Sequence, residues 1–114
     1  MAFGSLLAAG ELDRRITIQR SAPVSNRFNE KVDVWSDLAT VWAKKEDLSD
    51  RERIAAQEVS AEAMARFRIR WSARVADVNA KDRIVYRGKV YGITAVKEIG
   101  RRVGLELSAT AGAD

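Results

Sequence analysis

The stretch of this sequence best suited to chemistry is Arg66-Phe67-Arg68-Ile69-Arg70-Trp71, in which three arginines alternate with three large apolar residues. Side chains on a β-strand point to opposite faces with a period of two. A strand here places the apolar residues on one face and the arginines on the other, whereas no helix gathers all three apolar residues at that spacing. The sequence therefore predicts a half-buried strand with a basic face that could bind anions.

Three interpretations of this basic face stay open from the residues alone. It could be a solvated outer face with ion pairs between strands, a subunit interface in which arginine makes planar bidentate contacts, or a surface facing nucleic-acid phosphates. Arg74 lies just beyond the strand and could extend any of them. Arg101 and Arg102 are expected at a hairpin tip, where the simplest interpretation is a soluble turn.

Enzymatic chemistry has little support in the composition. The chain contains no histidine and no cysteine, which excludes Cys/His zinc sites, Ser-His-Asp triads and Cys-His pairs. Glu58 and Glu62 are four residues apart and could share a helical face, but like charges at that spacing repel. No clustered pair suggests acid–base catalysis, so we expect neither an enzyme nor a cofactor.

Length and charge favour one domain with an anionic partner. The chain has 114 residues, a net charge of +4 and a sequence pI of about 9.8. The basic excess centres on residues 49–87, which carry nine basic and six acidic side chains. No apolar run approaches the roughly 20 residues that span a bilayer. We expect a mobile N-terminal arm over residues 1–9, one domain over residues 10–108 and a flexible tail over residues 109–114.

Alternating apolar residues between turn signals predict a mainly β fold. The expected strands are residues 12–20, 32–35, 41–47, 66–71, 83–86, 90–96 and 103–107. Arg87-Gly88 indicates a tight hairpin, and residues 99–102 a second turn. With one short helix over residues 50–57, this pattern favours a small antiparallel β-barrel or sandwich of five to seven strands.

Two polar segments are the candidate contact loops of this fold. They are residues 21–31 and residues 47–65, which hold the candidate contact residues Arg27, Glu30, Lys31, Arg51 and Glu52. Residues 36–38, between two extended pieces, resemble a short turn or bulge. Trp35 and Trp42 are expected to pack in the core or on the sheet rather than to stack on a ligand.

Taken in order, these landmarks resemble the phage head-tail joining proteins, also called head-tail adaptor, head-closure or stopper proteins. The elements that carry the resemblance are Gly10-Glu11-Leu12 before Arg15-Ile16-Thr17-Ile18-Gln19, Trp35 with Val41-Trp42-Ala43, Arg51-Glu52 before Ala55-Ala56-Gln57, Ile69-Arg70-Trp71, Arg83-Ile84 with Gly88, Tyr91 and Ile93, and Arg101-Arg102 before Leu105-Glu106-Leu107. The resemblance covers residues 10–108. One departure is Asn29-Glu30-Lys31, where the family usually has an Asp and a Gly.

The resemblance implies a structural ring subunit without catalytic activity or cofactor. Such a ring, a homo-oligomer that we expect to be a hexamer or dodecamer, sits between the portal or adaptor and the tail of a phage, prophage or gene transfer agent. It retains the packaged double-stranded DNA and docks the tail, in a particle made in the bacterial cytoplasm and without a membrane partner. The arginine face is then expected at an interface or on the outer surface.

A small basic β-barrel that binds nucleic acid is the alternative function. Against it, Phe67 and Trp71 share the face of Ile69, so we expect them in the core rather than on a stacking platform.

The N-terminal arm gives a first prediction. Deletion of residues 1–9 is expected to leave a folded monomer, because the predicted core begins later, but to weaken assembly of the ring. Circular dichroism would check folding, and the yield of joined particles would check assembly. Normal joining of heads to tails by the truncated protein would contradict this role.

Overall fold

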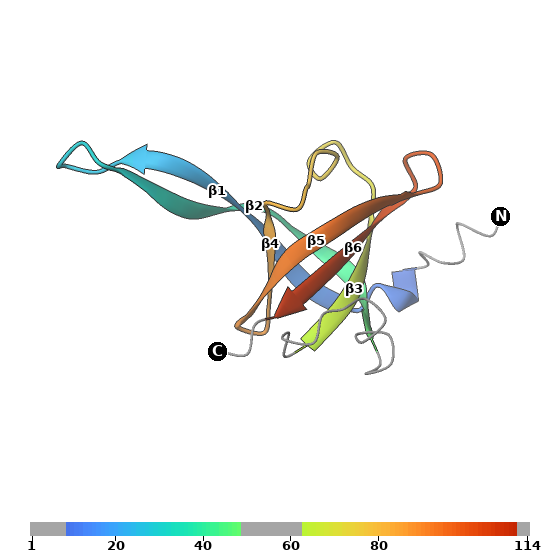
Figure 1. Ribbon diagram of the computed structural model, residues 1–114. Coiled ribbons are helices and arrows are strands. Elements are labelled where there is room, and N and C mark those ends of the chain that lie inside the picture. Colours follow the sequence, from blue (N-terminus) through green and yellow to red (C-terminus); the bar gives the residue numbers. More distant parts are fainter. Residues whose placement is uncertain (1–8, 49–62, 112–114) are drawn as a thin grey trace.

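Six antiparallel strands close into a barrel within the described part of the chain (Figure 1). The computed structural model describes residues 9–48 and 63–111. Its elements are a 3-10 turn η1 (Ala9–Glu11) and the strands β1 (Arg14–Ser25), β2 (Lys31–Asp47), β3 (Ala63–Arg70), β4 (Arg83–Tyr86), β5 (Lys89–Ile99) and β6 (Gly104–Ala111). Around the barrel the order is β1-β2-β3-β6-β5-β4, which confirms the predicted mainly β fold.

Two turns contain the backbone conformations that their sequences predict. β4 and β5 pair up to Tyr86 and Lys89, so Arg87-Gly88 forms a two-residue hairpin turn with φ of +50° and +76°. Positive φ at both central residues gives the twist that matches antiparallel strands, and glycine adopts it without a steric penalty. In the turn between β5 and β6, Gly100 and Arg102 also have positive φ. Both turns therefore join strands that are neighbours in the barrel.

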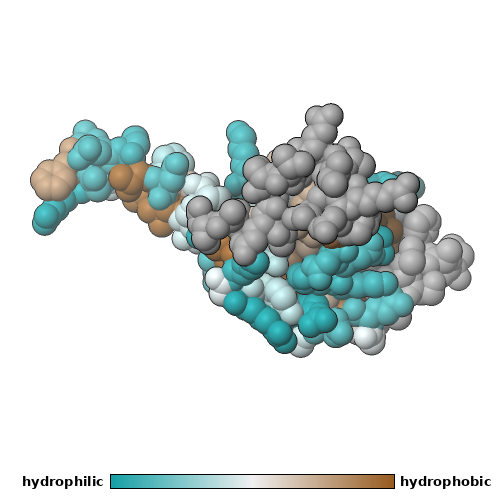
Figure 2. Space-filling view, turned by 60° about the horizontal axis from the view of Figure 1, so that its bottom comes forward, coloured by the Kyte–Doolittle hydropathy of each residue, from teal (hydrophilic) through white to brown (hydrophobic). Residues whose placement is uncertain are grey.

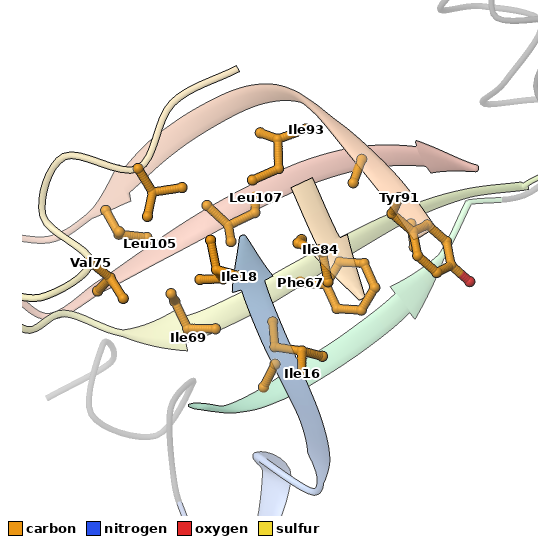
Figure 3. Close-up of a cluster of buried hydrophobic side chains, with 14 of the residues drawn as sticks. Ile16, Ile18, Phe67, Ile69, Val75, Ile84, Tyr91, Ile93, Leu105 and Leu107 are labelled. Carbon is orange, nitrogen blue, oxygen red and sulfur yellow. The ribbon is translucent and has the colours of Figure 1, made fainter. Parts of the chain in front are cut away.

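The barrel interior is filled by the inward-facing residues of all six strands. The buried cluster includes Ile16, Ile18, Phe67, Ile69, Ile84, Tyr91, Ile93, Leu105 and Leu107 (Figure 3). Phe67 is the largest of its fully buried side chains, and its ring lies 5.3 Å from that of Tyr91 in an edge-to-face contact. The alternation predicted for residues 66–71 is confirmed: Phe67 and Ile69 are fully buried, and Trp71 is half-buried against the core.

The first hairpin is longer than predicted. Residues 21–25, expected in a loop, continue β1 and pair with residues 31–35 of β2, so the loop prediction is wrong for this segment. Pro23 is tolerated because it lies in a two-stranded ribbon, where edge positions need no further hydrogen-bond partner. β2 is continuous, but its register against β1 shifts so that Ile18 pairs with Ala39 and Gln19 with Asp37. Leu38 is therefore the extra residue of a bulge, the second form that we expected there.

Two further expectations need correction. Residues 109–111 belong to β6, where Ala109 and Ala111 are buried, rather than to a flexible tail, because small side chains fit against the closed interior. Of the two placements expected for Trp35 and Trp42, the core is wrong: both lie on the outer face of the sheet, 36% and 51% exposed. The predicted helix over residues 50–57, with Arg51 and Glu52, falls outside the described residues, as do residues 1–8.

The buried side chain of Phe67 gives a stability prediction. Phe67→Ala is expected to lower the free energy of unfolding by about 3–5 kcal/mol, because it removes a fully buried aromatic side chain and leaves a cavity. Phe28→Ala is the matched control, since Phe28 is 68% exposed, and it should change that free energy by less than about 0.5 kcal/mol. Urea unfolding measures both. Equal effects of the two changes would contradict the placement of the core.

Candidate interaction surfaces

The arginine face of β3 is an ion-pair ladder on the outside of the barrel. Arg68 pairs with Glu106 of β6 at 3.2 Å and lies 3.8 Å from Glu46 of β2. Arg66 contacts the same two carboxylates, at 3.4 and 3.7 Å. The register places Arg68 directly opposite Glu106, and Arg66 opposite Glu46. Two arginines thus meet two glutamates within one chain, which favours the solvated, ion-paired interpretation of this face.

The remaining predicted contact residues do not gather in one site. Arg74 donates from Nε to the backbone oxygen of Leu38 at 3.0 Å, which ties the β3–β4 loop to the bulge. The guanidinium of Arg102 stacks over the Trp71 ring, 5.2 Å from the ring centroid. Arg101 is exposed in the same turn, and Arg70 is exposed at the end of β3. Arg27, Glu30 and Lys31 lie at the tip of the first hairpin.

The end of the first hairpin projects from the barrel as a two-stranded ribbon (Figure 1). We define the ribbon as residues 20–36, because β4 pairs with β1 only over Thr17–Gln19 and β3 pairs with β2 only from Ala43 onward. The space-filling view shows the same projection, with apolar surface along it and at its tip (Figure 2). Four side chains form its apolar strip: Ala22, Val24, Val32 and Val34.

The apolar strip is the inner face of the barrel continued into solvent. Ile16 and Ile18 point into the barrel, and side chains two residues apart share a face, so Ala22 and Val24 continue the same side. Their partners in the register are Val34 and Val32. No other strand of the described chain pairs with the ribbon, and the three valines are 42–48% exposed. A contiguous apolar face of this kind indicates a protein–protein contact.

Arg20 fastens the base of the ribbon to the β3–β4 loop. Its Nε and Nη2 donate to the two carboxylate oxygens of Asp82 at 3.0 Å each, and its Nη1 donates to Asp77 at 2.9 Å. Asp82 has a side chain that is 1% exposed, and it also accepts the backbone N–H of Asn79 at 3.0 Å. A buried carboxylate is thereby satisfied by a bidentate arginine, which is the stronger geometry for such a pair.

We call Arg20, Asp77 and Asp82 the Arg20 clamp, and its hydrogen bonds shift the pKa values of Arg20 and Asp77. Hydrogen bonds to Asp82 and then to Asp77 raise the pKa of Arg20 above its usual range. The hydrogen bond from Arg20 lowers the pKa of the Asp77 carboxyl. A carboxyl with a depressed pKa stabilises the fold above its unfolded pKa of about 4 and loses that contribution as the pH falls through the folded value. The clamp is therefore intact at neutral pH.

On its outer face, the base of the ribbon is held by a stack between Arg83 and Trp35. The guanidinium of Arg83 lies 4.1 Å from the centroid of the Trp35 ring. Its Nε also donates to Gln19 Oε1 at 2.8 Å, and Gln19 Nε2 donates to Asp37 at 3.0 Å. With Arg20 on the inner side and Arg83 on the outer side, the ribbon leaves the barrel in a fixed direction.

A second exposed aromatic side chain lines a shallow groove on the barrel. The groove has a volume of about 570 Å³ and is lined by Gly10, Leu12, Asp13, Trp42 and Arg70. It adjoins a smaller depression that shares Leu12, Trp42 and Arg70 and adds Arg15. Arg15 stacks over the Trp42 ring at 5.1 Å. We call this surface the Trp42 groove; it combines an apolar floor with charged side chains at its rim.

Sequence reasoning missed the ribbon, the Arg20 clamp and the Trp42 groove. The signal for the ribbon was present: Ala22 and Val24 alternate, as do Val32 and Val34, on either side of Asn26 and Asn29. The clamp joins residues 62 positions apart, and no local pattern predicts it. Within residues 9–48 and 63–111, no group of His, Cys, Asp or Glu could hold a metal ion, and no helix is long and apolar enough to cross a membrane.

Two solved structures are similar to this fold. The protein SF1141 from Shigella flexneri 2a, solved in solution, is 29% identical, with 95% of this chain and 99% of that chain covered and a TM-score of 0.74. A chain of the virion of a native gene transfer agent particle is 18% identical, with 90% and 96% covered and a TM-score of 0.64. Among curated proteins, none matches the chain. In fold class, the described residues form a small closed β-barrel with a projecting two-stranded ribbon.

The family model of the phage head completion proteins matches residues 7–112 of this chain. The chain therefore belongs to the phage head completion protein family, and the predicted resemblance to head-tail joining proteins is confirmed. Its role is structural, in head–tail assembly, and its place is in a virion.

The clamp gives a prediction with an internal control. Arg20→Met is expected to lower the free energy of unfolding by roughly 3 kcal/mol, because it leaves the buried Asp82 carboxylate without its charged partner. Asp77→Ala should cost less, since the Asp77 side chain is 69% exposed and its ion pair is screened by water. Urea unfolding at pH 7 compares the two. A larger loss for Asp77→Ala than for Arg20→Met would contradict the assignment of Asp82 as the principal partner.

Proposed function

We propose that this chain is a head-closure subunit that forms a ring between the portal or adaptor and the tail, retains the packaged DNA and docks the tail. The observation that carries the proposal is the fixed ribbon with an uncovered apolar strip, in a chain of the phage head completion family. A subunit that works alone gains nothing from four exposed apolar side chains on a projecting ribbon. A subunit of a ring can bury them.

Closed rings arise when each subunit offers one surface to its neighbour and receives a different one, and the rotation closes. The ribbon supplies a projecting surface, and the barrel supplies a receiving one. The three strip valines are already more than half covered, so burial of the rest would contribute roughly half of the 1.5–3 kcal/mol that complete burial of such a side chain is worth. Repeated around a ring, this modest contact stabilises the whole assembly.

The charge distribution suits a ring through which DNA passes without adhering. Arg66 and Arg68 are paired with Glu46 and Glu106 on the outer face of the barrel, so this face is of mixed charge. A continuous basic surface would bind phosphates strongly, with a steep dependence on salt. This role requires no catalytic step and no cofactor.

The nucleic-acid-binding alternative draws less support from the geometry. Phe67 and Ile69, on the face considered for base stacking, are fully buried. Sequence-independent binding of short single strands by the isolated monomer would favour this alternative over the closure ring.

Complementation tests the proposal. A particle that lacks this gene is expected to produce heads without tails that lose their DNA, and the wild-type chain should restore tailed, filled particles. The variant Val24→Ser/Val32→Ser/Val34→Ser should fold but restore them at least about tenfold less well, because about 1.4 kcal/mol of lost contact energy is enough for that change. Electron microscopy and counts of protected DNA provide the measurement.

Val90→Ser is the matched control for the strip variant. Val90 is 43% exposed, as the strip valines are, but it lies next to the β4–β5 turn, away from the ribbon. It should complement fully. Normal tailed particles without the gene would contradict the proposed function, and full complementation by the strip variant would contradict the role of the strip.

A further inference from the structure

We propose that the ribbon tip of one copy of this chain inserts Phe28 into the Trp42 groove of the next copy. This inference rests on the proposed ring and names the contact that builds it. The partner is a second copy of the chain, and the two surfaces are different, so the contact is head-to-tail.

Hydrogen bonds within the turn at the ribbon tip hold Phe28 in an exposed position. Asn26 Oδ1 accepts the backbone N–H groups of Phe28 and Glu30 at 2.9 and 3.0 Å, and the backbone N–H of Asn29 donates to the Asn26 carbonyl at 2.9 Å. Asn29 has a positive φ of 61°, which asparagine tolerates better than most residues. These hydrogen bonds give the turn a defined backbone conformation, in which Phe28 is 68% exposed.

The groove is complementary to the tip in polarity. Its floor contains Leu12 and Trp42, and Trp42 is 51% exposed, so an aromatic ring could enter between apolar surfaces. Phe28 is already covered on one side by Arg27, whose guanidinium is 5.0 Å from its ring centroid. Exposed aromatic side chains that pair across an interface are typical binding anchors.

The charges around the two surfaces also match. Arg27 and Glu30 flank Phe28 on the tip, whereas Asp13 and Arg15 flank the groove. The Asp13 side chain is 65% exposed and lies 3.6 Å from Arg14, so its carboxylate can also receive Arg27 of another copy. Arg15 can likewise receive Glu30. Complementary charges at the rim fix the orientation of such a contact.

The two surfaces lie on opposite sides of the molecule. In Figure 1 the ribbon tip extends to the far left, whereas the short turn of residues 9–11, which begins the groove, lies on the right of the barrel. The longest dimension is 55 Å, against 34 and 23 Å for the other two. A tip that points away from its own groove can fill only the groove of another copy, and repetition of that contact generates a ring when the rotation between copies closes.

Engineered cysteines test the contact without interference, because the chain has none of its own. The pair Phe28→Cys with Gly10→Cys puts one thiol at the tip and one in the groove, and a Cβ at Gly10 meets no atom within 4 Å. In assembled particles under mild oxidation, this pair should give a ladder of disulfide-linked oligomers that ends at the ring size and collapses on reduction. Phe28→Cys with Ala76→Cys, at an exposed loop position, is the matched control and should give no ladder.

Two results would overturn the proposal. Tailed particles in which the Phe28→Cys/Gly10→Cys chain stays monomeric would show that the tip does not reach the groove. Dimers from Phe28→Cys alone would show that two tips meet each other. Either result leaves the proposed function standing, since that function fails only if particles without the gene are joined and filled normally.

A charge exchange tests the contact with Phe28 in place. Arg27→Glu should reduce the yield of joined particles roughly tenfold, because it sets two carboxylates against each other at the groove rim. Adding Asp13→Arg to the same chain should restore the yield to within about threefold of wild type. Urea unfolding confirms that each variant folds. Folded variants in which the second change fails to rescue the first would contradict the proposed pairing.

Discussion

The bidentate ion pair between Arg20 and Asp82 fixes the projecting ribbon to the barrel, and the proposed assembly depends on that placement. At position 20, β1 leaves the barrel while still presenting the inner face of the sheet. An apolar residue there would lie at an open barrel end, but an arginine can reach the buried carboxylate and the exposed Asp77 together. Since an isolated two-stranded hairpin is marginal in water, the clamp and the Trp35–Arg83 stack are what hold the ribbon in one direction.

The fold has two parts, a closed barrel and the ribbon that projects from it. The six-stranded barrel pairs its strands in a closed ring and buries one apolar cluster around Phe67, so it needs no partner to fold. The ribbon carries the same inward-facing pattern beyond the barrel, where nothing in the described chain opposes it. The chain thus has a closed body and an exposed apolar strip, and we propose that a neighbouring subunit of the particle covers this strip.

Local pattern predicted the barrel better than it predicted the interaction surfaces. Alternation identified Phe67 and Ile69 as core, and Arg87-Gly88 as a hairpin, because period and turn chemistry are local properties. The ribbon was read as a loop because Pro23 and the polar residues near it outweighed the valine alternation. The ion pairs of Arg66 and Arg68 could not be predicted locally, because only the register of three strands brings Glu46 and Glu106 beside them. Arg20 gave no signal, since its partners are distant in sequence.

A map of the assembled particle by electron microscopy, at a resolution that traces β-strands, tests the central claim most directly. We expect a ring of this chain at the head–tail junction, with the ribbon of each subunit lying on the barrel of the next and Phe28 beside Trp42. A map that places the chain elsewhere in the particle, or a ring whose ribbons touch no neighbouring subunit, would contradict it.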